Sequence, residues 1–294
     1  MTIKVALIWG PHRRDPLFHT HHSFWEATLQ DHPNIFATRY TWEDWEDMPK
    51  TFDLYFFVDF HPSLYKLARH SFKNTVLYWW DSFHRSLCVT LQAASLFNRV
   101  YFAEKLSALQ ANAYGLPVHW LPAAFYQKLY GPISGVNKVH HYAFIGHLDD
   151  EIVRNGDTRK SLIVKLSHAK DLHGYVGEGV YGSTVNQIYN ESEILLDRTI
   201  FANIGTRFFE TIGSGGLALV NRPWLDNGLA EIATEGVHYA AYDDTYPDFE
   251  AKFRYYLDRP EERQEIAFRG YKHFVDHHTY AHRLETILSD MKLK

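Results

Sequence analysis

A polar turn that leads into an apolar helix (ANIGTRFFETIGSGG) carries the residue types best suited to chemistry in this sequence. Asn203, Gly205 and Thr206 form the turn, and we expect Thr206 to cap the helix. The N–H groups of a first helical turn bind phosphate, helped by the partial positive charge there. Arg207 can add a charge-assisted hydrogen bond to a diphosphate, and Glu210 can accept hydrogen bonds from sugar hydroxyls. The pattern alone predicts either a diphosphate site or an ordinary capped helix that ends at glycines.

Further polar residues follow predicted strands, at the ends where open parallel sheets bind their ligands. Asp81 comes directly after the apolar run TVLYWW, His61 belongs to VDFHP, and His12 follows the first apolar run of the chain. Aspartate or histidine can act as a general base toward a hydroxyl group, so these three are candidate catalytic residues. Gly146 and His147 end another predicted strand and are candidates for contact with phosphate or sugar. Each of these residues is also readable as a helix cap or a loop residue.

Short apolar runs alternate with longer amphipathic stretches along the chain, which is the pattern of parallel sheets with crossover helices. The stretch 126–141 contains glycine, proline and serine without a clear period, and we interpret it as an interdomain linker. The alternation restarts after it. The sequence therefore predicts an α/β protein with two Rossmann-like domains, residues 1–130 and 131–294, whose parallel sheets face a central cleft.

Composition narrows the class of protein. The 294 residues are 46% hydrophobic, which excludes disorder as the main state, and a net charge of -5 argues against general nucleic-acid binding. The one cysteine, Cys88, excludes an internal disulfide framework. No apolar run approaches the ~20 residues that span a bilayer, so we expect a cytoplasmic protein without a transmembrane segment. We also expect no metal, because no cysteine or well-spaced carboxylate accompanies the histidines His19, His21 and His22.

The helix and the segments around it resemble the spore-maturation-protein (CgeB-like) glycosyltransferases. The stretch RFFE, then SGG and the apolar run LALV, matches their R-x-F-E-x-x-x-S-G-x-hydrophobic signature. The segments YAFIG (142–146) and YNESEILL (189–196) match in the same order, and so does the chain end from Tyr255 to Arg283. Before Tyr142 the resemblance rests on the order of strands and helices and on the residues WWD.

This resemblance implies a metal-independent, hexosyltransferase-like enzyme of the GT-B fold. Such an enzyme moves a sugar from a nucleotide-diphosphate sugar to a hydroxyl group of a glycan, protein or small-molecule acceptor, with no cofactor beyond this co-substrate. The final helix, 280–292, would pack back on the N-terminal domain. The donor-binding residues implied by the resemblance are Gly146, His147, Asn203, Gly205, Thr206, Arg207 and Glu210.

One position departs from the pattern of many retaining GT-B enzymes, which carry two glutamates separated by seven residues. Glu210 matches the second glutamate, but Ala202 stands at the position of the first. The stereochemical outcome of a transfer is therefore open. The alternative function is a non-catalytic module that binds nucleotide sugars or glycans on the same scaffold.

Overall fold

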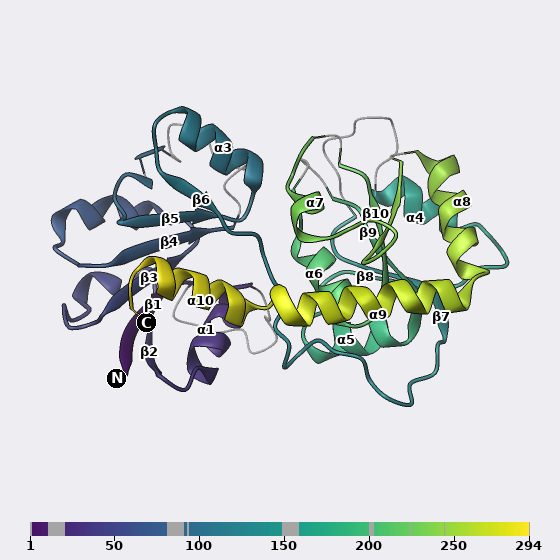
Figure 1. Cartoon of the computed structure of the whole chain (residues 1–294), viewed down its shortest axis with the longest axis horizontal. Helices are drawn as coiled ribbons and strands as arrows, with labels where there is room; N and C mark the ends of the chain where they lie inside the picture. Colours follow the sequence, from purple (N-terminus) through teal and green to yellow (C-terminus); the bar gives the residue numbers. More distant parts are fainter. Residues whose placement is uncertain are drawn as a thin grey trace. The chain divides into compact units, whose positions relative to one another are not determined.

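The chain folds into two α/β units, each built on a sheet of parallel strands, as seen in a computed structural model (Figure 1). The structure describes residues 2–10, 21–80, 91–92, 94–148, 159–199, 203–223, 225–243 and 245–293. Unit 1 comprises Met1–Ala123 and Tyr280–Lys294, and unit 2 comprises Ala124–Thr279. Within the described ranges, no helix combines the length and the apolar character that crossing a membrane requires.

Unit 1 is built on a six-stranded parallel sheet in the order β2-β1-β3-β4-β5-β6. Its strands are β1 (Ile3–Ile8), β2 (Ile35–Tyr40), β3 (Leu54–Val58), β4 (Thr75–Trp79), β5 (Arg99–Phe102) and β6 (Val118–Trp120). The central strands β3 and β4 read LYFFV and TVLYW, and every residue in them is buried. Unbroken apolar runs of this kind are typical of parallel strands that are covered on both faces.

Helices cover both faces of this sheet. On one face, α1 (His21–Asp31) packs against α10 (Tyr280–Asp290), as Figure 1 shows. Trp25 of α1 meets three rings at steep angles, those of Phe56, Tyr78 and Tyr280. The buried guanidinium of Arg283 fixes α10 by donating hydrogen bonds to the carbonyls of Pro122 and Ala123, at 2.8 and 3.0 Å. The other face packs against η1 (Trp45–Asp47), η2 (Pro62–Arg69) and α3 (Lys105–Ala113).

Unit 2 has a five-stranded parallel sheet in the order β11-β10-β9-β7-β8. Its strands are β7 (His140–Ile145), β8 (Gly174–Gly177), β9 (Ser192–Asp197), β10 (Leu217–Asn221) and β11 (Ala240–Tyr242). The helices are α4 (Arg159–Ser167), α5 (Ser183–Asn190), α6 (Thr206–Gly213), α7 (Leu229–Ile232), α8 (Tyr246–Leu257) and α9 (Pro260–His277). In this unit α6 packs against the long helix α9, where Phe208 and Phe209 meet the ring of Phe274.

The predicted class, α/β with two parallel sheets, is confirmed. The division between the units falls after Ala123 rather than after residue 130, and α10 is part of unit 1. The interpretation of 126–141 as a linker is wrong, because this stretch belongs to unit 2. Asn186 and Asn190 of α5 hydrogen-bond to the backbone N–H groups of Gly131 and Ile133, at 3.2 and 2.7 Å. A stretch without helical or strand periodicity is therefore ordered here by side-chain amides.

In both sheets the direction in which successive strands are added reverses at one point, the switch point. In unit 1, β2 lies on one side of β1, and the strands from β3 onward lie on its other side. In unit 2, β8 lies on one side of β7, and the strands from β9 onward lie on its other side. Ligands of doubly wound sheets bind at the carboxyl ends of the two strands that flank such a switch point. The fold thus singles out two places, one beside β1 and β3 and one beside β7 and β9.

Candidate functional site

The switch point of unit 2 contains the carboxyl ends of β7 and β9, at Ile145 and Asp197. Arg207 of α6 joins the two strand ends. Its Nε donates to the carbonyl oxygen of Ile145 at 2.6 Å, and its Nη1 donates to Oδ1 of Asp197 at 3.1 Å. The guanidinium also lies over the ring of Phe144, with its carbon 4.3 Å from the ring centroid. Arg207 is therefore held in one orientation by two strands.

Gly146 makes room for this arginine. Its φ of +144° belongs to a region that only glycine adopts readily. A Cβ atom on this residue would lie 1.9 Å from Nη2 of Arg207, far inside van der Waals contact. The glycine of YAFIG is thus required both by its backbone conformation and by the approach of Arg207.

Asp197 is a buried carboxylate that sequence reasoning missed. Its side chain is 2% exposed, and burial raises its pKa although the charge of Arg207 opposes that shift. Among the described residues, neither Oδ2 of Asp197 nor the hydroxyl of buried Tyr189 has a hydrogen-bond partner. The charges of Glu210, Arg207 and Asp197 all act on Tyr189, which places its hydroxyl beside the same cluster. The sequence feature that could have identified Asp197 is its position as a carboxylate at the end of an apolar strand.

Glu210 lies one helical turn after Arg207 and is partly exposed. Burial raises the pKa of Glu210, while a hydrogen bond from Tyr130 and the charge of Arg207 act in the opposite direction. Tyr130 lies in the stretch that the sequence suggested was a linker. A carboxylate held in this way has oxygen lone pairs with which to accept hydrogen bonds from hydroxyl groups.

The N-terminus of α6 differs from the prediction. Gly205, not Thr206, is the N-cap residue; its φ of -71° and ψ of 163° are extended, and the helix has no side-chain cap hydrogen bond. Thr206 is already the first helical residue, so the prediction that its hydroxyl caps the helix is wrong. The carbonyl of Asn203, two residues before the cap, accepts a hydrogen bond from Asn227 at 3.3 Å. The start of α6 therefore relies on groups other than a side-chain cap to satisfy its first N–H groups.

His147 is the most exposed of the predicted donor-binding residues, with 84% of its side chain accessible. Its Nδ1 lies 4.0 Å from Oε2 of Glu178, and its carbonyl accepts a hydrogen bond from Nη1 of Arg159 at 3.3 Å. Arg159 also donates through Nε to the carbonyl of Arg198, at 2.9 Å, which ties the end of β9 to the start of α4. The structure thus brings Gly146, Arg207 and Glu210 together, whereas the side chain of His147 points toward solvent.

Of the three candidate bases, only His61 lies within the described residues; His12 and Asp81 lie outside them. His61 caps η2, since its Nδ1 accepts from the N–H of Ser63 at 3.2 Å. Its ring stacks on Trp42, with centroids 5.2 Å apart and planes inclined by 7°. Because Nδ1 accepts this hydrogen bond, the neutral ring of His61 carries its hydrogen on Nε2, and its one acceptor nitrogen is already used in the cap.

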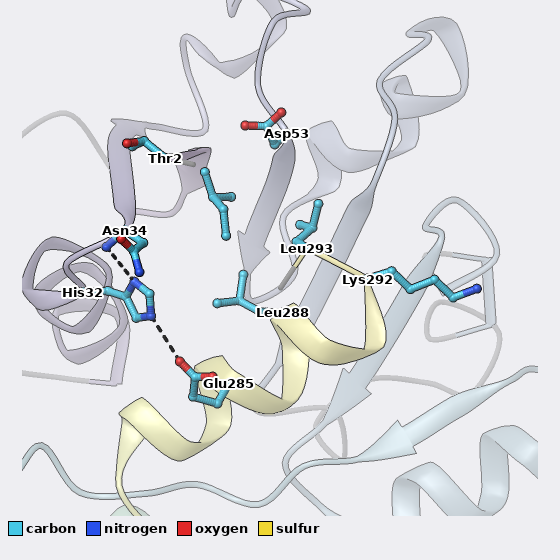
Figure 2. A pocket seen from close by; sticks show the side chains of 9 residues that line it. Thr2, His32, Asn34, Asp53, Glu285, Leu288, Lys292 and Leu293 are labelled. Carbon is cyan, nitrogen blue, oxygen red and sulfur yellow. Dashed lines mark hydrogen bonds and ion pairs between the residues drawn. The ribbon is translucent and has the colours of Figure 1, made fainter.

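A cavity of about 610 Å³ in unit 1 lies at the opposite edge of the sheet (Figure 2). Thr2, Asn34 and Asp53 line it just before β1, β2 and β3 begin, at the amino ends of the strands. Inside it, Nε2 of His32 lies 3.1 Å from Oε1 of Glu285, a contact that joins the residue after α1 to α10. Within unit 1, this cavity is therefore separate from His61, which lies at the carboxyl end of β3.

Comparison with known proteins agrees with the architecture. Residues 158–289 match the family described as glycosyl transferase-like. No curated protein sequence matches the chain. HepE of Anabaena, in complex with UDP and glucose, is similar in structure, with a TM-score of 0.73, 10% identity and coverage of 99% of this chain and 100% of HepE.

Two other solved structures share this fold. Sucrose-phosphate synthase of Thermosynechococcus elongatus gives a TM-score of 0.70 at 11% identity and covers 99% of both chains. An α-glucosyltransferase in complex with UDP-glucose and DNA containing an abasic site gives 0.69 at 9% identity, covering 99% of this chain and 100% of the other.

These findings define the fold. The fold is that of the GT-B glycosyltransferases, and the family match begins just before α4 and includes the whole of α6.

Proposed function

We propose that this protein transfers a sugar from a uridine-diphosphate sugar to an acceptor hydroxyl, and that unit 2 binds the donor diphosphate at the N-terminus of α6. The observation that carries the proposal is the start of this helix. It has no side-chain cap, and it lies at the switch point of the sheet, beside a guanidinium that two strand ends hold in place. N–H groups arranged in this way, with an adjacent arginine, favour a phosphate group.

The chemistry follows from this arrangement. When the bond between the sugar and the diphosphate breaks, negative charge grows on the leaving diphosphate. Preorganised N–H groups and the guanidinium of Arg207 stabilise that charge without having to reorganise. Asp197 keeps the guanidinium aligned through its 3.1 Å contact. Glu210 accepts hydrogen bonds from paired hydroxyls of the ribose or the transferred sugar, and Gly146, His147, Asn203 and Gly205 complete the donor site.

The nucleotide and the finer relationships are also part of the proposal. HepE and the α-glucosyltransferase were solved in complex with UDP or UDP-glucose, which supports uridine as the base. The RFFE and SGG segments support a place among the CgeB-like enzymes, and the chain's one cysteine fits a cytoplasmic location. Because the helix and Arg207 meet the diphosphate charge, we expect EDTA to leave the affinity for UDP unchanged. His12, His61 and Asp81 remain the candidate general bases.

A pair of substitutions at one position tests the donor site. Proline is tolerated at the first position of a helix, and the ψ of 163° at Gly205 suits a residue that precedes proline. Thr206→Pro therefore keeps the helix but removes one N–H donor, whereas Thr206→Ala keeps the N–H and removes only the hydroxyl. Losing a hydrogen bond to a charged group costs about 1.5–3 kcal/mol, so Thr206→Pro should weaken UDP binding about 10- to 150-fold. Titration calorimetry with UDP should show no such loss for Thr206→Ala, and equal affinities for the two variants would contradict the proposal.

Turnover separates the transferase from the binding module. The protein is incubated with UDP-sugars and a panel of glycan, protein and small-molecule hydroxyl acceptors, and free UDP is measured. Release of UDP that depends on the acceptor identifies a transferase. UDP-sugar binding without release for any acceptor identifies the module, for which Ala202 at the position of a donor-side glutamate is the sequence argument.

A further inference from the structure

The switch point of unit 1 holds a cluster of two histidines and an aspartate. His21 and His22 are the first residues of α1, and Asp59 follows the carboxyl end of β3. Ligands of a doubly wound sheet are expected at this place, beside β1 and β3. The sequence alone suggested no metal here because no cysteine or well-spaced carboxylate accompanies these histidines along the chain. The parallel pairing of β1 with β3 supplies that carboxylate from a distant segment.

The three side chains converge on one point. Nε2 of His21 and Nε2 of His22 lie 2.9 and 2.6 Å from Oδ2 of Asp59, and the three atoms are all within 4.8 Å of one another. The other carboxylate oxygen, Oδ1, accepts a hydrogen bond from the backbone N–H of Trp80 at 2.8 Å. Burial acts to raise the pKa of Asp59, but the neighbouring histidines hold it below its usual range. One oxygen is thus fixed by the backbone while the other points at two imidazoles.

The surroundings hold these side chains rigidly. The ring of His22 stacks on Trp9, with centroids 5.2 Å apart, and the ring of His21 stacks on Trp80 at 5.0 Å. The side chains of the cluster are only 11–22% exposed. Asp59 has a φ of +70°, which is uncommon for a residue other than glycine and is kept where the surroundings enforce it. Such preorganisation is typical of a ligand-binding site rather than of a surface ion pair.

We propose that His21, His22 and Asp59 bind a divalent transition-metal ion, with zinc as the reference ion. Two imidazole nitrogens and one carboxylate oxygen are a donor set that zinc accepts, whereas magnesium and calcium prefer oxygen ligands throughout. In a tetrahedral zinc site the ligand atoms are about 3.3 Å apart, given bonds of about 2.0–2.1 Å, so small side-chain rotations open the present contacts to that spacing. Three protein ligands leave the fourth position to a water molecule or to an oxygen atom of a bound molecule. The N–H of Trp80 orients the carboxylate from outside, as the outer partners of metal ligands do.

Zinc binding to the full chain tests this proposal. The metal-free protein is titrated with ZnCl₂ in a calorimeter, and Co²⁺ is used in parallel because its visible absorption reports tetrahedral nitrogen and oxygen ligation. We expect one tight site. Asp59→Asn is the key variant, because asparagine tolerates the positive φ and can still accept the hydrogen bond from Trp80. Loss of an outer partner of a metal ligand typically costs 10- to 100-fold in affinity, so losing the ligand itself should cost at least about 100-fold.

The control is His168→Ala, which removes an exposed histidine at the end of α4 and should leave zinc affinity unchanged. His21→Ala and His22→Ala should each weaken binding as Asp59→Asn does, and near-ultraviolet circular dichroism checks that each variant is folded. Absence of a tight site in the wild-type chain would overturn the proposal. So would zinc affinity that stays the same in folded Asp59→Asn. The site lies in unit 1, so these outcomes are independent of the donor site proposed for unit 2.

Discussion

The pair formed by Arg207 and Asp197 permits a quantitative prediction for Arg207→Met. Methionine keeps most of the volume over Phe144 but removes the charge that accompanies a carboxylate only 2% exposed. Breaking a buried pair by removing one partner typically costs 3–5 kcal/mol. Asp197 can avoid this cost by taking up a proton, and protonating a carboxyl group with an ordinary pKa at pH 7 costs about 4 kcal/mol. We therefore expect Arg207→Met to lower the free energy of unfolding of unit 2 by about 3–4 kcal/mol at pH 7.

The same reasoning fixes how this loss depends on pH. In the variant, the pKa of Asp197 in the folded state is raised further above its unfolded value, so the destabilisation grows as pH rises. Each pH unit is worth about 1.4 kcal/mol, and the loss should shrink to about 1.5 kcal/mol at pH 5. Urea unfolding of wild type and variant at both pH values measures this change.

A second substitution serves as the control for this prediction. Asp197→Asn removes the charge that Arg207 compensates, so the double variant Arg207→Met/Asp197→Asn should be more stable at pH 7 than Arg207→Met alone. If the loss is the same at pH 5 and pH 7, or if Asp197→Asn gives no relief, the stabilisation comes from packing on Phe144 and the electrostatic reasoning is refuted.

Three further predictions follow from single contacts. Gly146→Ala should lower the free energy of unfolding by at least about 2 kcal/mol and also weaken UDP binding, because its Cβ would strike Arg207; for Gly205→Ala, no described residue beyond its chain neighbours has an atom within 4 Å of the added Cβ, so urea stability should stay nearly unchanged. Burial, with the charges of His273 and Arg269, lowers the pKa of His238, so the unfolded chain takes up that proton first and the thermal midpoint should fall as pH drops below about 6.5; an identical pH profile for His238→Gln would contradict this. Arg283→Met should destabilise unit 1 by about 2–5 kcal/mol in urea, since the carbonyls of Pro122 and Ala123 lose their buried donor, and a change below 1 kcal/mol would refute that role.

The elements that the sequence predicted most clearly are those with an unbroken apolar run or a distinct polar turn. The runs LYFFV and TVLYW became the central strands β3 and β4, and the turn before RFFE became the start of α6. The strand β2 was missed because it is an edge strand: IFATRY has no fully buried residue and so lacks the apolar run that marked the others. The strand β11 has only three residues, too few for any period.

The sites were less predictable because they depend on contacts between distant segments. Arg207 donates a hydrogen bond to the carbonyl of Ile145, which is 62 residues away in the sequence, so no local pattern predicts this contact. Asp197 directly follows the segment YNESEILL, and nothing in the sequence marks it as a partner for a cation. His21 and His22 are adjacent in the sequence, but the carboxylate of Asp59 comes near them only because β3 pairs with β1.

The chain passes between the units twice, after Ala123 and after Thr279, so unit 2 is an insertion within unit 1. During synthesis, unit 2 can complete its sheet while unit 1 still lacks α10. Until residues 280–293 have left the ribosome, Trp25 lacks the ring of Tyr280, and the carbonyls of Pro122 and Ala123 lack Arg283. Unit 1, although made first, must therefore be the last to reach its final form, and a shortened transcript that ends near residue 279 would yield a finished second half attached to an unfinished first.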